Sequence, residues 1–276
     1  MFNLNDKEIN ELFCKAELYN DIFVDVDDDT SFVKLANLIC EEIRLDCYCT
    51  ECKKERTFIS VKTTNPLLGK YNNAIRCFTG RPSNRSMIRY LQYFSRSFTC
   101  SMNDSHDLIF YFRLNKNTIQ KIGQYPSLAD LEQNDIKKYD KVLSKANLSD
   151  LSKAIGLHAH GVGAGSFVYL RRIFEDLIEE AYKESVSAMT LSESINFNGI
   201  KMKEKIDNLN VYLPSFIYSN PVLYDFLSGG IHSLDEEYCK DNFEKLKEAI
   251  FVILDQDIRK KEDMDREQRL SVLNLE

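Results

Sequence analysis

Four residues in the first half of the chain have the types and spacing of a metal site. Cys49 and Cys52 form a Cys-x2-Cys pair, and Cys100 and His106 follow as a looser Cys-x5-His pair. A short spacing lets one tight turn direct two ligand atoms at the same ion, and two such pairs complete a tetrahedral zinc site. The sequence therefore predicts a structural Zn2+ ion, because four protein ligands leave no open position for a reacting water molecule.

Other cysteines offer alternatives to this ligand set. The chain contains eight cysteines; Cys47 competes with Cys49, and Cys77 competes with either distal ligand. A further alternative is that these residues are free thiols around a small β-core. The remaining cysteines lie in helical patterns with apolar neighbours, where we expect buried side chains: Cys14, Cys40 and Cys239.

Positive charge is concentrated in the same part of the chain. The 276 residues have a formal net charge of -7, but residues 53–121 contain 13 basic and 3 acidic residues and carry +10. Cations that contact phosphates, together with aromatic rings on which bases stack, are typical of nucleic-acid-binding surfaces. The candidate cations are Lys53, Lys54, Arg56, Arg76, Arg81, Arg85, Arg89 and Arg96, interleaved with Phe58, Tyr71, Phe78, Tyr90, Tyr93, Phe94 and Phe98. Alternatively, the aromatic residues form a sheet core and the arginines pair with the acidic segments on either side.

The elements that must position these residues change from helix to strand and back to helix. The patterns predict helices over 5–20 and after Thr30, strands over 56–62, 88–99 and 107–114, and helices from Pro126 onward. The expected fold class is α+β, with N-terminal helices over 1–45, a small zinc-ribbon-like β module over 46–125, and a helical domain over 126–276. We expect a cytoplasmic protein without a membrane partner, because no apolar run reaches the length of a membrane helix and the N-terminus is too polar for a signal peptide.

The glycines at 161, 163 and 165 precede a predicted helix that begins at Ser166. Their spacing is not that of a dinucleotide-binding loop, and the residues before them read as helix instead of strand. The free N–H groups at the start of the helix could hold an anion. His158 and His160 are interpreted as turn residues. His232 lies between two predicted helices, where it is either structural or a general base toward a ribose hydroxyl.

Several segments carry a family resemblance. They are Gly165-Ser-Phe-Val-Tyr-Leu-Arg171-Arg172-Ile-Phe-Glu, Met202-Lys-Glu-Lys-Ile206, Ser228-Gly-Gly-Ile-His232 with the helix that follows, and, upstream, Lys121-Ile-Gly-Gln-Tyr-Pro126-Ser-Leu-Ala-Asp130. In these segments the chain resembles a bacterial domain-of-unknown-function family related to the HEPN superfamily. The resemblance covers roughly residues 45–260.

The resemblance implies a helical bundle that forms a homodimer, and many HEPN proteins are metal-independent ribonucleases of toxin and antiviral systems. Their motif is an arginine, a polar residue and a histidine. His232 matches the histidine, but residues 226–228 are Phe, Leu and Ser, so the motif arginine is missing. Arg171 or Arg172, on another helix, could stabilise the phosphate charge if the fold brings one of them close.

The basic segment and the missing arginine together favour binding over cleavage. We expect a protein of a bacterial defence or toxin-like system that binds RNA or DNA and is weakly catalytic or non-catalytic. One alternative is an active HEPN-type ribonuclease that uses His232. The other is a protein-interaction adaptor whose basic segment docks onto an acidic partner.

Overall fold

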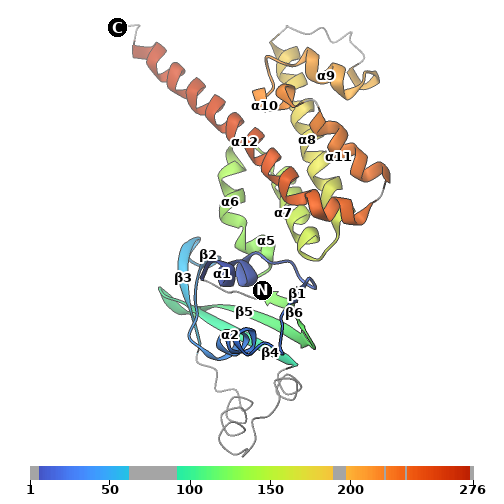
Figure 1. The fold of residues 1–276 in the computed structure, drawn as a ribbon. Helices are drawn as coiled ribbons and strands as arrows, with labels where there is room; N and C mark the ends of the chain where they lie inside the picture. The colour runs from blue at the N-terminus through green and yellow to red at the C-terminus, as the bar shows by residue number, and fades with distance from the viewer. Residues whose placement is uncertain (1–5, 62–91, 189–196, 221, 234, 274–276) are drawn as a thin grey trace, which may run out of the picture. The chain divides into compact units, whose positions relative to one another are not determined.

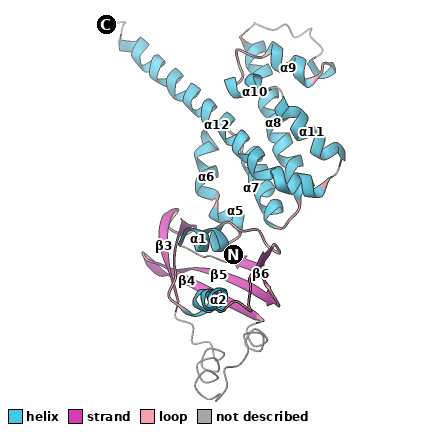
Figure 2. Cartoon of the chain, in the orientation of Figure 1, coloured by secondary structure: helices cyan, strands magenta, loops and turns pink. Residues whose placement is uncertain are grey.

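The computed structural model describes residues 6–61, 92–188, 197–220, 222–233 and 235–273 (Figure 1). The chain divides into two compact units, Met1–Asn134 with Ala159–Gly161, and Asp135–His158 with Val162–Glu276. The first unit contains an antiparallel sheet and the second is helical (Figure 2). The predicted α+β class is therefore confirmed. The described helices include none that is both long and apolar enough to cross a membrane.

The first unit combines short helices with six strands. Its elements are α1 (Asp6–Cys14), β1 (Asp21–Phe23), α2 (Asp29–Cys40), β2 (Arg44–Cys49), β3 (Lys54–Ser60), β4 (Tyr93–Cys100), β5 (Asn103–Asn115), β6 (Thr118–Tyr125) and α5 (Leu128–Leu131). Helix α2 begins where Asp28 accepts a hydrogen bond from the N–H of Ser31 at 2.8 Å, as an N-cap aspartate does.

The sheet has the strand order β1-β6-β5-β4-β3-β2, with all neighbours antiparallel. Strands β2 and β3 form one hairpin, and β4, β5 and β6 form a meander. Only three residue pairs, Phe58 with Cys100, Ile59 with Thr99 and Ser60 with Phe98, join β3 to β4. The N-terminal segment, which we expected to be separate from the β module, contributes β1 to the far edge of this sheet.

One face of the sheet forms the core of the first unit. Alternate residues of β4 and β5 are buried against the helices, as period-two alternation requires. Phe13 of α1 lies edge-on to Phe98, Phe110 and Phe112, with ring centroids 5.1 to 5.2 Å apart. Helices α1 and α2 thus share a single core with the sheet, so residues 1–45 and 46–125 are not independent parts.

Two cations of the basic segment lie inside this core. Arg96 is buried and donates hydrogen bonds to the carbonyl oxygens of Ile39 and Glu41, the latter at 2.6 Å. Lys121 is also buried, and its Nζ donates to the carbonyl oxygen of Phe13 at 3.1 Å. The last carbonyl groups of a helix lack partners within the helix. These two side chains supply such partners at the ends of α2 and α1.

The second unit is built of helices. They are η1 (Lys138–Lys141), α7 (Lys145–Ala159), α8 (Gly163–Ser187), η2 (Phe197–Gly199), α9 (Met202–Asn208), α10 (Ser215–Ser219), α11 (Val222–Ser233) and α12 (Glu236–Leu273), and α6 (Gln133–Lys137) leads into them. Helices α8 and α12 form the central pair, burying Phe167, Leu170 and Phe174 on one and Phe243 and Ile250 on the other. The helices predicted from Pro126 onward are therefore present, and α12 continues through the charged residues after Arg259 to Leu273.

The buried ammonium of Lys121 predicts a pH dependence of stability. Burial lowers the pKa of Lys121 to about 8. The unfolded chain therefore binds more protons between about pH 8 and pH 10.5, and the free energy of unfolding should rise with pH in this window. The rise is of order 3 kcal/mol for a shift of this size. Below about pH 8 the full penalty of a buried charge remains.

The substitution Lys121→Met removes this titration. We expect the difference in melting temperature between the wild type and the variant to change from pH 7 to pH 10, in favour of the wild type at the higher pH. Calorimetric scans at several pH values measure it. A constant difference across this range would show that the pKa of Lys121 is not lowered in the folded protein.

Candidate metal centre

The first pair of cysteines lies at the end of the β2–β3 hairpin. Cys49 is the last residue of β2, and Cys49 faces Lys54 across the hairpin. The N–H of Lys53 donates to the carbonyl oxygen of Cys49 at 2.7 Å, and the N–H of Cys52 lies 3.4 Å from the Cys49 Sγ. Lys53 adopts the left-handed conformation, with φ of 54°. This tight turn directs both thiols to the same point.

The second pair lies where β4 turns into β5. Cys100 pairs with Asn103, but the next pair along the ladder joins Thr99 to Asp107, so three residues of β5 bulge out of register. His106 is the last residue of this bulge. A bulge changes the direction in which a side chain points. This bulge brings the His106 imidazole level with Cys100. It explains how two ligands separated by five residues can still be directed at the same ion.

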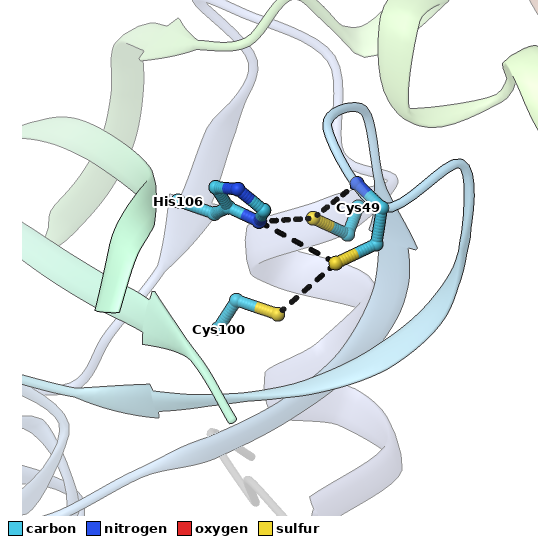
Figure 3. Close-up of side chains that lie close together, drawn as sticks. Cys49, Cys100 and His106 are labelled. Atoms are coloured by element: carbon cyan, nitrogen blue, oxygen red, sulfur yellow. Dashed lines mark hydrogen bonds between the residues drawn. The ribbon is translucent and has the colours of Figure 1, made fainter. Parts of the chain in front are cut away.

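The four predicted ligands converge (Figure 3). Their ligand atoms all lie within 4.8 Å of one another. The Sγ atoms of Cys52 and Cys100 are 3.9 Å apart, and His106 Nδ1 lies 3.7 Å from Cys49 Sγ and 3.4 Å from Cys52 Sγ. A tetrahedral ion at zinc-like bond lengths of about 2.0 to 2.3 Å requires ligand separations of about 3.6 to 3.8 Å. The cluster has the dimensions needed to bind a metal ion.

The surroundings of the thiols act on their pKa values in opposite directions. Burial raises the pKa of Cys49, against the effect of hydrogen bonds from the N–H groups of Cys52 and Glu51. Burial also acts to raise the pKa of Cys100, but backbone hydrogen bonds from Met102 and Asn103, together with hydrogen bonds from the Cys52 and Cys49 thiols, outweigh it and the pKa lies below its usual value. Backbone N–H groups directed at sulfur favour thiolates, which is the form that binds metals.

Asn103 is a residue of the site that the sequence reasoning missed. Its side-chain amide lies 3.2 Å from Nε2 of His106, the ring nitrogen that faces away from the cluster. Its Oδ1 accepts hydrogen bonds from the N–H and hydroxyl of Ser105 at 3.0 and 2.9 Å. These contacts order the turn that carries His106 between Cys100 and Asp107. The sequence signal was the Asn-x-Ser pattern of a turn in which a side chain bonds to the backbone.

The structure distinguishes among the alternative ligands that it describes. Cys47 lies outside the cluster and packs in the core of the first unit. A hydrogen bond with the Cys14 thiol, together with burial, raises the pKa of Cys47. Cys14 and Cys239 are buried, as predicted. Cys77 and the side chain of Cys40 lie outside the described residues.

The predicted phosphate-binding cations divide into three groups. Lys53 and Lys54 are exposed beside the cysteine turn, and Arg56 is partly exposed, with its Nη1 donating to the carbonyl oxygen of Glu55 at 3.3 Å. Arg96 is in the core and has no surface to offer a phosphate, which corrects its assignment. The rest lie outside the described residues: Arg76, Arg81, Arg85 and Arg89.

The glycine-rich turn meets an anion of the same chain. The Glu236 carboxylate accepts hydrogen bonds from the N–H groups of Gly163 and Ala164, the latter at 3.1 Å, at the N-terminus of α8. A Cβ atom at Gly163 would lie 2.5 Å from the carbonyl oxygen of Glu236, so glycine is required for this close approach. The anion-binding end predicted from the sequence is therefore occupied by a side chain.

The candidate catalytic arginines are engaged in ion pairs. Arg171 Nε lies 2.8 Å from Glu175, and its Nη2 donates to the hydroxyl of Tyr224 at 3.2 Å. Arg172 Nη1 lies 2.9 Å from Asp150 Oδ2. Burial opposes ionisation of Asp150, but hydrogen bonds from Lys153 and Arg172 outweigh it and lower its pKa.

The histidines of this unit differ in what the structure describes. His158 is buried in α7 instead of lying in a turn, and its ring stacks on Phe243 with centroids 4.0 Å apart. His232 belongs to α11, and its side chain lies outside what the structure describes.

The Glu236 contact gives a stability prediction for the second unit. We expect Glu236→Ala to lower the free energy of unfolding by about 1 to 2 kcal/mol, because it leaves two N–H groups at a helix start without their partner. Glu237→Ala is the matched control, since Glu237 is an exposed neighbour on the same helix turn. Thermal unfolding followed by circular dichroism measures both. Equal melting temperatures for the two variants would contradict the capping role.

No family model, curated protein or solved structure matches this chain. The assignment of Cys49, Cys52, Cys100 and His106 as ligands therefore depends on their converging atoms and donor chemistry.

Proposed function

We propose that the first unit is a nucleic-acid-binding module built around a structural zinc ion. The observation that carries the proposal is the convergence of three thiols and one imidazole from two separate hairpins. Three cysteines and one histidine form a common ligand set of structural zinc sites, and four protein ligands close the coordination sphere. The ion would stabilise the fold and supply no chemistry.

Two exposed cations connect this site to an anionic partner. Lys53 and Lys54 follow Cys52 directly, so the turn that presents the thiols also positions these ammonium groups. The connection between β3 and β4 adds to the positive charge, since residues 62–91 contain six basic residues and no acidic residue. Cations of this density attract a phosphate backbone and release its counterions.

Binding is favoured over cleavage by what the candidate catalytic groups contact. Arg171 and Arg172 form ion pairs with Glu175 and Asp150 within their own unit. An arginine that stabilises phosphate charge must be free to contact it, and these partners compete for that contact. The proposed activity is therefore binding of nucleic acid.

The zinc ion is tested by metal content. We expect the purified protein to contain about one zinc ion per chain, and Cys52→Ser to lose it, because three ligands hold the ion much less tightly than four. Cys47→Ser is the control, a buried cysteine of the same strand pair that lies outside the cluster. Elemental analysis of the three proteins measures the metal. If the purified wild type contains no metal and all of its thiols react with a titrating reagent, the proposal of a bound zinc ion is wrong.

The basic surface is tested by the salt dependence of binding. We expect labelled RNA and DNA oligonucleotides to bind at low salt, with an affinity that falls steeply as salt rises. The double substitution Lys53→Glu and Lys54→Glu should weaken binding by about tenfold or more and flatten the salt dependence by roughly one unit of slope per lost phosphate contact. Fluorescence anisotropy measures both quantities.

Lys15→Glu provides the control for this experiment. Lys15 is an exposed lysine of the same unit, next to the end of α1, and its substitution makes the same type of charge change away from the cysteine turn. Binding that does not respond to salt, or an equal loss in the control, would contradict a basic surface at the turn.

A further inference from the structure

The face of the sheet opposite the helices exposes a set of tyrosines. Tyr93 on β4, Tyr111 on β5 and Tyr125 on β6 have exposed fractions of 56%, 48% and 58%. Their neighbours along the strands, such as Phe94, Phe110 and Phe112, point to the core. Large aromatic side chains exposed on three adjacent strands are uncommon in a surface that has only to face water.

The strand register places these tyrosines in a diagonal row. Tyr111 faces Ser95 on β4, two pairs along the ladder from the Tyr93–Arg113 pair and therefore on the same face. Tyr111 also faces Gly123 on β6, one pair along that face from the Ile109–Tyr125 pair. Diagonal neighbours on one face lie about 7 to 8 Å apart, within reach of aromatic side chains. The three residues therefore lie on one diagonal across three strands, at whose end Tyr125 also borders the pocket beside Cys49 and His106.

The residues directly opposite the row are small. Ser95 faces Tyr111 on one side, and Gly123 on the other has no side chain to cover the ring. The Tyr111 side chain lies against Gly123, where a Cβ atom would be 3.6 Å from Tyr111 Cδ2. About half of the Tyr111 side chain stays exposed to a planar ligand.

The two ends of the tyrosine row differ in charge. Arg113 faces Tyr93 at one end, and among the described residues its guanidinium forms no ion pair and its Nε has no hydrogen-bond partner. Asp107 lies on the same face beyond Ile109, at the other end. Arg113 is partly exposed, and a cation next to an aromatic row is the combination that tracks a single strand.

We infer that the row formed by Tyr93, Tyr111 and Tyr125 is a stacking surface for the bases of single-stranded nucleic acid, with Arg113 contacting the phosphate at its first end. This inference rests on the proposed function and specifies its substrate class. Bases in a duplex are stacked on each other and cannot present their faces to side chains, whereas those of a single strand can. The tyrosine row therefore binds single strands in preference to duplexes. The basic surface near the cysteine turn adds affinity for both.

The experiment compares a single-stranded oligonucleotide with its duplex by fluorescence anisotropy at a fixed low salt concentration. We expect the single strand to bind the wild type at least about tenfold more tightly than the duplex. Tyr111→Leu, and Tyr125→Leu as a second variant on another strand, should each lower the affinity for the single strand by about tenfold. Tyr111→Phe keeps the ring and should bind as the wild type does.

Phe23→Leu is the matched control. Phe23 is an exposed aromatic residue on the same face, but it faces Thr118, at the opposite end of β6 from Tyr125. We expect no change in this variant. The melting temperature and metal content of every variant establish that it is folded before its affinity is compared.

Each outcome has a separate meaning. If the wild type binds no nucleic acid at low salt, the proposed function fails. If binding depends on Lys53 and Lys54 but is the same in Tyr111→Leu and Tyr125→Leu, or if the duplex binds as well as the single strand, the stacking surface alone is overturned. Loss of self-association in Tyr111→Leu with unchanged nucleic-acid affinity would place a second copy of the chain on this face instead.

Discussion

The first unit depends on how its two hairpins are held together. Strand β3 pairs with β4 through three residue pairs only, and the end of the β2–β3 hairpin extends beyond this short ladder. The four ligand atoms gather at that end, next to the last β3–β4 pair, Phe58 with Cys100, and the hydrogen bond from the N–H of Ser101 to the carbonyl oxygen of Thr57. A metal ion at this position would add bonds between the hairpins where the ladder ends. The orientation of Lys53 and Lys54 would then follow from the same bonds.

The opposite faces of the sheet have different physical tasks. The covered face buries aromatic rings against α1 and α2, and it meets the carbonyl groups at the ends of those helices with Arg96 and Lys121. Buried cations are costly unless they are hydrogen-bonded, so both side chains tie the helices to the sheet. The other face needs no such closure and keeps its tyrosines exposed.

The sequence predicted the parts of the site that depend on local spacing. Cys49 and Cys52 follow from one tight turn. Tyr93, Phe94 and Phe98 were treated as one aromatic set, and only the structure separates the exposed Tyr93 from the two buried phenylalanines. Three features depend on non-local packing and were missed. The first is the bulge before Asp107, which explains the wide Cys-x5-His spacing. The second is β6, whose sequence is too rich in polar residues to show alternation. The third is the burial of Arg96, because arginine is rarely buried. Glu236 was missed because it acts on residues 73 positions earlier.

The 73-residue separation between Gly163 and Glu236 also matters during synthesis of the chain. Helix α8 leaves the ribosome before Glu236 exists, and synthesis at roughly 5 to 20 residues per second leaves several seconds before residue 236 follows. During this time the N–H groups of Gly163 and Ala164 must be satisfied by water. The close approach at Gly163 can form only when α12 arrives. The second unit therefore completes its central helix pair late, as contacts distant in sequence require.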